Sequence, residues 1–474
     1  MINIQDHAKI EKVVRFFEEF SAIPHGSGNT ALIADYLVEF AKARGLEHTR
    51  DAADNVIIRK KATAGYEDRP AIIFQGHLDM VADKKPGAAI DMEKEGLTLY
   101  RDGDFLRAKD TTLGGDDGVA LAYALAILDS EDIPHPDFEA VFTSDEEIGL
   151  LGAVAIDQNE IKGRLLINID SDEEGVFTVG CAGGMRSDVT LPVSRTNSET
   201  EAYKLKAYGF KGGHSGVEID KGRVNANKAL VEILTKIGDI SIKDIRGGNA
   251  DNAIPRECEC IFSSENDVTD LVKDLGNEIK ARYADIEPDI AFSIEAVEST
   301  VAGLSTDDSA RLVSLLDKLP SGIIAMSTDV EGLVETSLNM GILRLEADRA
   351  EVSFSVRSAK GAEKEKLGQR LETIAREHGA SYSTRGAYPA WEYKKDSHLR
   401  DVMKKVYEDM YNKSPAIVII HAGLECGIFS EKIEGLDCVS IGPNNYDIHT
   451  TEERLSLSSF ERVWDFLLNV LREI

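Results

Sequence analysis

His77 and Asp79 stand two residues apart, directly after the short apolar run 71–74. This run is typical of a buried parallel strand. Because residues i and i+2 point to the same side of an extended segment, both side chains leave the strand end together. Open α/β sheets bind ligands at the carboxyl ends of their strands, and a carboxylate can orient a metal-binding imidazole. Taken alone, the pair also fits a strand-end turn with an incidental histidine.

Other acidic or imidazole side chains follow predicted strands in the same way. They are Glu146 and Glu147 after 139–143, Asp170 after 165–169 and His449 after 438–441, and Asp116 and Asp117 lie in a glycine-rich loop before an apolar helix at 119–128. Each has an ordinary explanation by itself, such as a helix cap or a solvated turn. Because the carboxyl ends of parallel strands meet at one edge of a sheet, we expect the whole set to converge there.

Carboxylates crowded at one edge repel each other unless a cation holds them together. Imidazole and carboxylate groups form a ligand set that suits zinc, with cobalt or manganese as alternatives. Five residues suffice for two ions that share one bridging carboxylate: His77, Asp116, Glu147, Asp170 and His449. Two metals about 3.5–4 Å apart can activate a water and hold a reacting oxygen. Glu146, which points away from its neighbour Glu147, is then the candidate general base.

The elements that would position these groups alternate between strand and helix. Helices are expected over 8–20 and 30–44, and strands over 55–59 and 71–74, while 97–108 reads as an irregular or hairpin stretch. This alternation predicts βαβ units and a mainly parallel sheet. Near the end of the chain, a buried strand over 416–420 and a terminal helix over 457–472 continue this α/β pattern.

Between these parts the pattern changes. From 186 to 388 the strands become amphipathic and are separated by helices near 225–237, 266–284 and 361–378, which is typical of an α+β layer with one solvated sheet face. We therefore expect an α/β catalytic domain made of 1–185 and 389–474, interrupted by an inserted α+β lid or dimerisation domain of 186–388.

Composition excludes several classes of function. A chain of 474 residues is too long for a single core, which favours two domains. The net charge of −30 argues against a nucleic-acid partner, because such binding depends on Lys and Arg. No apolar run approaches the roughly 20 residues of a membrane helix, and no signal peptide is evident. Five cysteines, an odd number, suggest no disulfide framework. A cytoplasmic enzyme without membrane attachment fits these features.

Taken together and in order, the motifs resemble those of the co-catalytic zinc peptidases, a family that includes aminoacylases, glutamate carboxypeptidases and dipeptidases. They occupy residues 75–81, 111–118, 145–149, 168–171, 211–216 and 252–256, together with His449, so the resemblance covers essentially the whole chain. It implies two zinc ions and hydrolysis of dipeptides with broad specificity, Xaa-His included. The alternatives are a deacylase of N-acyl amino acids on the same residues and a non-catalytic binding protein.

The resemblance also implies a role for each site residue. Asp116 would bridge the metals, with His77 and Asp170 completing one site and Glu147 and His449 the other. Asp79 would orient His77, and Glu146 would be the general base. The peptide bond between Asp116 and Asp117 is similar to one that is cis in the family.

The inserted domain has an implied role as well. His214 resembles a histidine that reaches the active site of a partner subunit and polarises the scissile carbonyl, which implies a homodimer with composite sites. Asn252 and Arg357 resemble residues that bind the backbone and carboxylate of a small peptide substrate, and Gly423 and Glu425 would line its pocket. The alternatives are an ordinary loop histidine at 214 and a surface salt bridge at 357.

Overall fold

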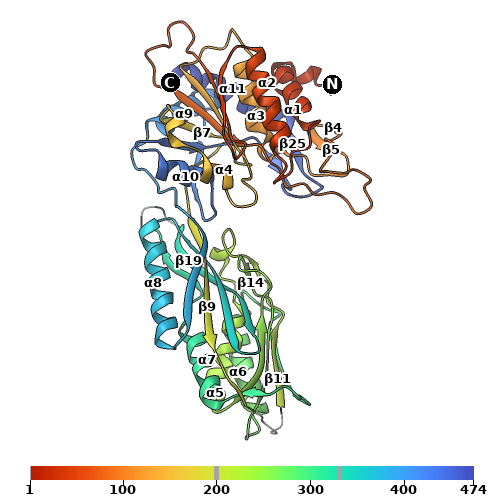
Figure 1. Ribbon diagram of the computed structural model, residues 1–474, viewed down its shortest axis with the longest axis vertical. Coiled ribbons are helices and arrows are strands. Elements are labelled where there is room, and N and C mark those ends of the chain that lie inside the picture. Colours follow the sequence, from red (N-terminus) through yellow and green to blue (C-terminus); the bar gives the residue numbers. More distant parts are fainter. Residues whose placement is uncertain (1, 197–201, 329, 331) are drawn as a thin grey trace. The chain divides into compact units, whose positions relative to one another are not determined.

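The structure, a computed structural model, describes residues 2–196, 202–328, 330 and 332–474. It divides into two compact units (Figure 1). The first consists of Met1–Gly180, Tyr393–Ile419 and Leu424–Ile474, and the second of Cys181–Glu392 and Ile420–Gly423. The catalytic and lid roles expected for the two domains stay predictions.

Parallel strands form the centre of the first unit. Its described residues contain an eight-stranded sheet in the order β1-β2-β6-β3-β7-β23-β8-β22. The four central strands run parallel: β6 (Phe138–Thr143), β3 (Ile72–His77), β7 (Leu165–Asn168) and β23 (Asp437–Ser440). The outer strands are β1 (Glu47–Arg50) and β2 (Val56–Lys60), both antiparallel to their neighbours, then β8 (Val176–Cys181), antiparallel to β23, and β22 (Ala416–Ile420). Strands β3, β6 and β7 are buried along their whole length.

Helices cover this sheet and explain its apolar strands. The larger ones are α1 (Glu11–Ser21), α2 (Ala31–Ala43), α3 (Gly115–Leu128), α9 (His398–Tyr411) and α11 (Leu457–Glu473), with the shorter α4 (Leu151–Ala155) and α10 (Glu425–Lys432). Helix α3 packs against β3 and α1, and Figure 1 shows α1, α2, α3 and α11 grouped together. Tyr123 of α3 stacks on Trp464 of α11, with ring centroids 5.7 Å apart. Almost every residue of α3 is buried, as its apolar sequence predicts.

A small sheet carries the last segment of the site. In the described residues it has four strands, in the order β24 (Asn445–Tyr446), β25 (Arg454–Ser456), β5 (Phe105–Ala108) and β4 (Leu99–Asp102). The stretch 97–108 is thus a hairpin. The sequence predicts a loop from the strand at 438–441 to His449, with no strand between them. The chain leaves β23 at Ser440 and enters the small sheet first, so His449 lies in the loop between β24 and β25.

The second unit is an antiparallel sheet layered with helices. Where this unit is described, the sheet contains β16 (Ala291–Val297), β11 (Ala202–Tyr208), β15 (Cys258–Ser263), β13 (Ser241–Gly247), β19 (Val334–Leu345), β20 (Arg349–Ser358), β9 (Gly183–Pro192) and β21 (Ser381–Tyr388), and β18 (Gly322–Met326) pairs with β19. The helices are α5 (Ala226–Ile237), α6 (Thr269–Arg282), α7 (Thr306–Lys318) and α8 (Gly361–Glu377). Burial alternates along β11 and β15, which leaves one face more solvated.

The expected fold class, an α/β domain with an inserted α+β domain, is confirmed by this architecture and by its likeness to a solved structure described below. Helix α7 was not predicted, although Ser305 caps it by accepting a hydrogen bond from the N–H of Asp308. Within the described ranges, no helix is both long and apolar enough to span a bilayer.

Candidate metal centre

A glycine at the end of β3 brings the start of α3 close to His77. A Cβ at Gly76 would lie 2.3 Å from both the Cβ of Ala120 and Oδ2 of Asp117. Only a residue without a side chain therefore permits this approach. Asp117 Oδ2 accepts a hydrogen bond of 3.2 Å from the His77 N–H, which fixes the end of the strand. The peptide bond between Asp116 and Asp117 is cis.

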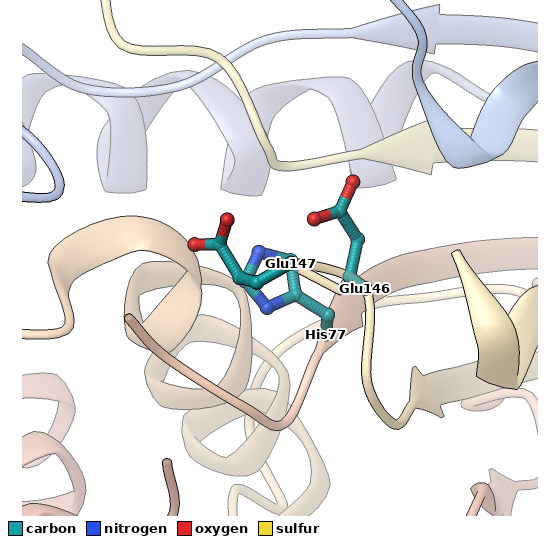
Figure 2. Close-up of side chains that lie close together, drawn as sticks. All are labelled: His77, Glu146 and Glu147. Atoms are coloured by element: carbon teal, nitrogen blue, oxygen red, sulfur yellow. The ribbon is translucent and has the colours of Figure 1, made fainter. Parts of the chain in front are cut away.

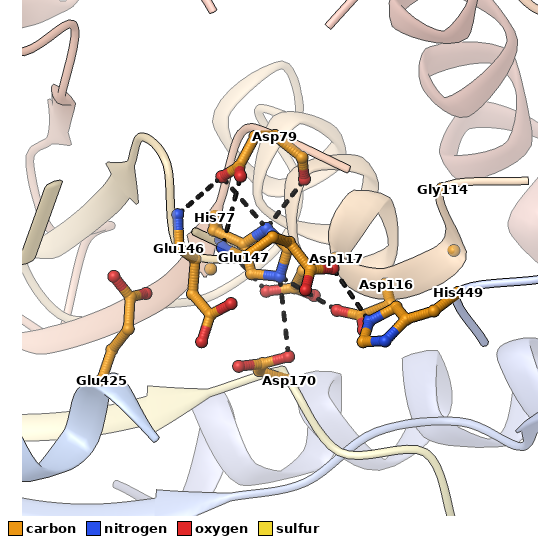
Figure 3. Close-up of polar contacts among 12 residues, drawn as sticks. His77, Asp79, Gly114, Asp116, Asp117, Glu146, Glu147, Asp170, Glu425 and His449 are labelled. Atoms are coloured by element: carbon orange, nitrogen blue, oxygen red, sulfur yellow. Dashed lines mark hydrogen bonds and ion pairs between the residues drawn. The ribbon is translucent and has the colours of Figure 1, made fainter. Parts of the chain in front are cut away.

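Asp116 lies between two imidazoles (Figure 3). Its Oδ1 is 2.9 Å from Nε2 of His77, and its Oδ2 is 3.0 Å from Nε2 of His449. Each of these nitrogens also faces a second carboxylate: His77 Nε2 is 3.8 Å from Oδ1 of Asp170, and His449 Nε2 is 2.9 Å from Oε1 of Glu147. The structure thus brings the five expected ligands together as two triads that share Asp116.

These donor atoms fit divalent cations. Within each triad the atoms lie within 4.8 Å of one another, and ligands about 2 Å from a tetrahedral zinc ion lie about 3.3 Å apart. An imidazole nitrogen carries one hydrogen at most, so it cannot donate a full hydrogen bond to two carboxylates at once. A cation placed among the three groups satisfies all of them. The residues present therefore fit two bound metal ions with Asp116 as the bridge.

The Asp79 carboxylate contacts more than the histidine it was expected to orient. His77 Nδ1 is 2.8 Å from the backbone carbonyl oxygen of Asp79 and 3.5 Å from its carboxylate. The carboxylate oxygens accept hydrogen bonds from the N–H groups of Glu146 at 2.9 Å and Glu147 at 3.3 Å, and from the Ser27 hydroxyl at 2.7 Å. Asp79 therefore holds the turn that carries Glu146 and Glu147 in place beside His77.

Glu146 and Glu147 extend in different directions from the turn after β6 (Figure 2). Glu147 lies against His449, whereas Glu146 extends toward Asp170 and Glu425 (Figure 3). A donor atom of Glu146 also lies within 4.8 Å of donor atoms of His77 and Glu147. Distance alone would therefore permit Glu146 as a ligand, but the two triads around Asp116 are complete without it.

The electrostatics of the cluster are dominated by burial and by the two imidazoles. Burial, with the nearby carboxylates of Asp116 and Asp117, raises the pKa of Asp170 well above its ordinary value. Burial raises the pKa of Glu146 to about 8. Burial also opposes ionisation of Asp116, yet hydrogen bonds from His449 and His77 hold its pKa well below the ordinary value. A bound cation would favour the ionised form of all these carboxylates.

Glu425, the first residue of α10, is fully buried in the same cluster (Figure 3). Its Oε2 accepts hydrogen bonds from Nε2 of Gln75 at 2.5 Å and from the Thr143 hydroxyl at 2.7 Å. Burial raises the pKa of Glu425 to about 7. Its expected contact with substrate stays a prediction.

His214, expected to be catalytic, and Asn252, expected to bind substrate, lie side by side in the second unit. His214 belongs to β12 (Gly213–His214), which pairs with β14 (Ala253–Ile254), and the backbone oxygen of Asn252 accepts a hydrogen bond of 2.8 Å from Ser215. Nδ1 of His214 accepts from two backbone N–H groups, each at 3.2 Å. The proton of the neutral ring is therefore on Nε2. Burial and the charge of Arg357 lower the pKa of His214, which favours this neutral form.

Arg357 is buried on β20 rather than placed on the surface. Its Nη1 donates a hydrogen bond of 3.0 Å to the hydroxyl of Tyr388. A Cβ at Gly423 would lie 2.8 Å from the Tyr388 ring, so this glycine lets the ring pack beside it. His421, whose Nε2 is 2.7 Å from the Ser337 hydroxyl, belongs to the same unit, and burial lowers its pKa to about 4. The position of these groups relative to the metal ligands stays a prediction.

Sequence reasoning missed several residues with clear contacts to the site residues. Ser27 and Tyr388 contact site residues through a hydroxyl group, and Glu453 contacts the Asp116 loop through a carboxylate. Ser27 lies between two glycines, which was the one available signal. Glu453 contacts a loop 337 or more residues earlier in the chain, so no spacing rule could have identified it.

Comparisons with known proteins identify a matching family, similar sequences and similar structures. The sequence profile described as Peptidase family M20/M25/M40 matches residues 73–473. The cytosol non-specific dipeptidase of Escherichia coli (strain K12) is 36% identical over 467 residues, which cover 97% of this chain and 96% of that protein. The crystal structure of aminoacylhistidine dipeptidase from Vibrio alginolyticus is similar with a TM-score of 0.92 and 34% identity, over 98% of this chain and 96% of that one. Aminopeptidase PepT from Bacillus cereus ATCC 10987, at 17% identity and a TM-score of 0.56 over 98% of each chain, shares the fold alone.

Proposed function

Because the chain belongs to the peptidase family M20/M25/M40, we propose that it is a metal-dependent dipeptidase that acts on small peptides with two bound cations. The family expected from the ordered motifs is confirmed by the profile match and by the relative from Escherichia coli. The observation that carries the proposal is the position of Asp116, whose two oxygens face two different imidazole nitrogens at 2.9 and 3.0 Å.

His77 and Asp170 would hold one metal ion, and Glu147 and His449 the other, with Asp116 shared between them. Zinc suits this mixture of imidazole and carboxylate ligands, and cobalt or manganese are alternatives. When bound, such a pair of ions lowers the pKa of an attacking water and polarises the carbonyl oxygen of the substrate. The protein contributes ligands whose positions are fixed by β3, by the start of α3 and by the turn after β6.

Glu146 is the proposed general base. Its N–H is held by Asp79 Oδ1 at 2.9 Å, so its backbone is fixed while its side chain extends past the ligands. Its carboxylate would take the proton of the attacking water and then transfer it to the leaving amine, which makes one residue the base and the acid in turn. Burial raises the pKa of Glu146, whereas two bound cations would favour its ionised form, which is the form that accepts a proton.

His214 is the proposed oxyanion donor. Since its Nδ1 accepts backbone hydrogen bonds, its Nε2–H is available to donate to the oxygen on which negative charge develops. We propose that it acts in the active site of a partner subunit, in a homodimer in which each subunit completes the site of the other. Arg357 would bind the substrate carboxylate through its guanidinium group, Asn252 the substrate backbone, and Gly423 and Glu425 would line the pocket.

The names of the relatives support the choice of substrate. One is described as a non-specific dipeptidase and one as an aminoacylhistidine dipeptidase. We therefore propose broad dipeptide specificity that includes Xaa-His. The name of the Escherichia coli relative likewise supports a cytoplasmic location. Deacylation of N-acyl amino acids on the same residues is the second candidate, because it needs the same base and the same cations.

Metal removal and a substrate panel test the proposal. Dialysis against a chelator should abolish hydrolysis of Xaa-His dipeptides, and zinc, cobalt or manganese should restore it. A panel of dipeptides and N-acetyl amino acids, run on the same zinc-loaded and manganese-loaded samples, separates the two candidates. Full activity in metal-free protein would contradict the metal centre, and turnover of N-acetyl amino acids alone would favour the deacylase.

A further inference from the structure

A buried carboxylate that is not among the metal ligands holds the loop that carries Asp116. Glu453 lies just before β25, and 3% of its surface is exposed. Its Oε2 accepts hydrogen bonds from the N–H groups of Leu113 at 2.7 Å and Gly114 at 3.0 Å, and its Oε1 accepts from Gly115 at 2.8 Å and Asp116 at 3.4 Å. One side chain thus binds four successive N–H groups of the loop.

The glycines of this loop make the approach possible. Gly114 has a φ of 68°, in the left-handed region that glycine adopts at little cost. A Cβ at Gly115 would lie 2.8 Å from the Asn445 amide nitrogen and 3.1 Å from Oε1 of Glu453. That amide donates a hydrogen bond of 3.1 Å to the same Oε1. The absence of a side chain at Gly115 therefore leaves room for both the Glu453 carboxylate and the Asn445 amide beside the loop.

Glu453 also connects two metal ligands that are distant in the sequence. It follows His449 by four residues, and its N–H donates to the carbonyl oxygen of Thr450 at 3.1 Å, which closes a turn. Its carboxylate binds the loop of Asp116, whose Oδ2 lies 3.0 Å from His449 Nε2. The loop of the bridging ligand and the loop of His449 are thus held to each other by one buried group.

We propose that Glu453 is a positioning residue of the metal centre, which keeps Asp116 and His449 at the separation at which they can share a cation. This role rests on the proposed metal centre. Glu453 acts through the backbone of Asp116 and through its own segment, and not as a ligand. The role requires a carboxylate, because the NH₂ group of a glutamine would face N–H donors where Glu453 presents an acceptor.

Zinc affinity in Glu453→Gln tests this role, with Glu452→Gln as the matched control. Glu452 is the exposed neighbour and pairs with Lys85 at 2.8 Å. Competition with a chromophoric chelator should show about 10–100-fold weaker zinc binding in Glu453→Gln, the range typical of groups that orient ligands, and no change in the control. Thermal unfolding of the metal-free proteins, measured in parallel, reports any general loss of stability.

Gly115→Ala disturbs the same contact by a change in the loop, because the added Cβ would push against Glu453 and Asn445. It should weaken zinc binding in the same direction, and the double variant should lose less than the sum of the two effects. Wild-type zinc affinity in folded Glu453→Gln, or in Gly115→Ala if the first variant does not fold, would overturn the proposal even if the unfolding temperature fell. Failure of the wild-type chain to bind zinc would overturn the metal centre itself, and the role of Glu453 with it.

Discussion

Replacing Glu146 by glutamine should remove turnover and leave the metal in place. Glutamine has nearly the same shape, and the backbone anchor to Asp79 Oδ1 at 2.9 Å involves only the N–H of residue 146. The two triads around Asp116 contain no atom of Glu146, so both metal sites should persist. What is lost is a group able to accept the proton of the attacking water.

The size of the loss follows from that role. A positioned general base typically contributes about 10²–10⁴-fold, which corresponds to about 2.7–5.4 kcal/mol of transition-state stabilisation at about 1.36 kcal/mol for each factor of ten. The kcat for a Xaa-His dipeptide should fall by at least this factor. Because the amide neither accepts nor delivers the proton at pH 7, both the attack and the departure of the amine should be slowed.

The neighbouring residue provides the control. In Glu147→Gln the same isosteric change removes a carboxylate whose Oε1 is 2.9 Å from His449 Nε2, so this variant should lose one bound ion. Metal content by atomic emission, measured beside the rate for both variants, separates the two roles. A donor atom of Glu146 also lies within 4.8 Å of donors of His77 and Glu147. If Glu146→Gln loses metal and Glu147→Gln keeps it, the assignment of base and ligand is reversed.

Three further predictions concern assembly, stability and packing. Mixing His77→Ala and His214→Ala subunits under conditions of subunit exchange should recover activity that each homodimer lacks, because one composite site then contains every group. If the subunits demonstrably exchange and no activity returns, His214 acts within its own subunit or outside the reaction. The metal-free protein should become less stable as the pH rises from about 6.5 to about 8. In the folded state Glu425 has a pKa of about 7 and Glu146 a pKa of about 8, so both keep a proton that the unfolded chain has already released. Each of these groups lowers the free energy of unfolding by up to about 1.4 kcal/mol per pH unit until the pH passes its folded pKa. Urea titrations with and without zinc measure this free energy, which should depend less on pH in the zinc form. Gly76→Ala should destabilise the fold by about 1–3 kcal/mol or more, since its Cβ would lie 2.3 Å from Ala120 and Asp117, whereas Gly361→Ala, where the nearest atom lies 3.7 Å away, should be nearly neutral in the same denaturation assay.

The convergence of the site could be predicted because it follows from strand direction. His77 ends β3, and Glu146 and Asp170 follow the ends of β6 and β7, which are parallel to it. Side chains at the carboxyl ends of such strands must lie at one edge of the sheet. His449 reached the same edge by another route, through the small sheet that contains β24 and β25. His449 lies beside Asp116 and Glu147, as expected, and its role as a metal ligand stays a prediction.

The contacts that position the ligands could not be predicted in the same way. The Asp79 carboxylate binds the N–H groups of Glu146 and Glu147, and Glu453 binds the N–H groups of residues 113–116. Every residue except proline has an N–H, so an acceptor for these groups leaves no pattern in the sequence of the loop it binds. Gly115 in the Asp116 loop is an indirect signal, because a Cβ there would lie 3.1 Å from Oε1 of Glu453 and 2.8 Å from the Asn445 amide nitrogen. This glycine leaves room for a buried acceptor from a distant part of the chain, and zinc affinity in Glu453→Gln measures whether that acceptor helps to define the site.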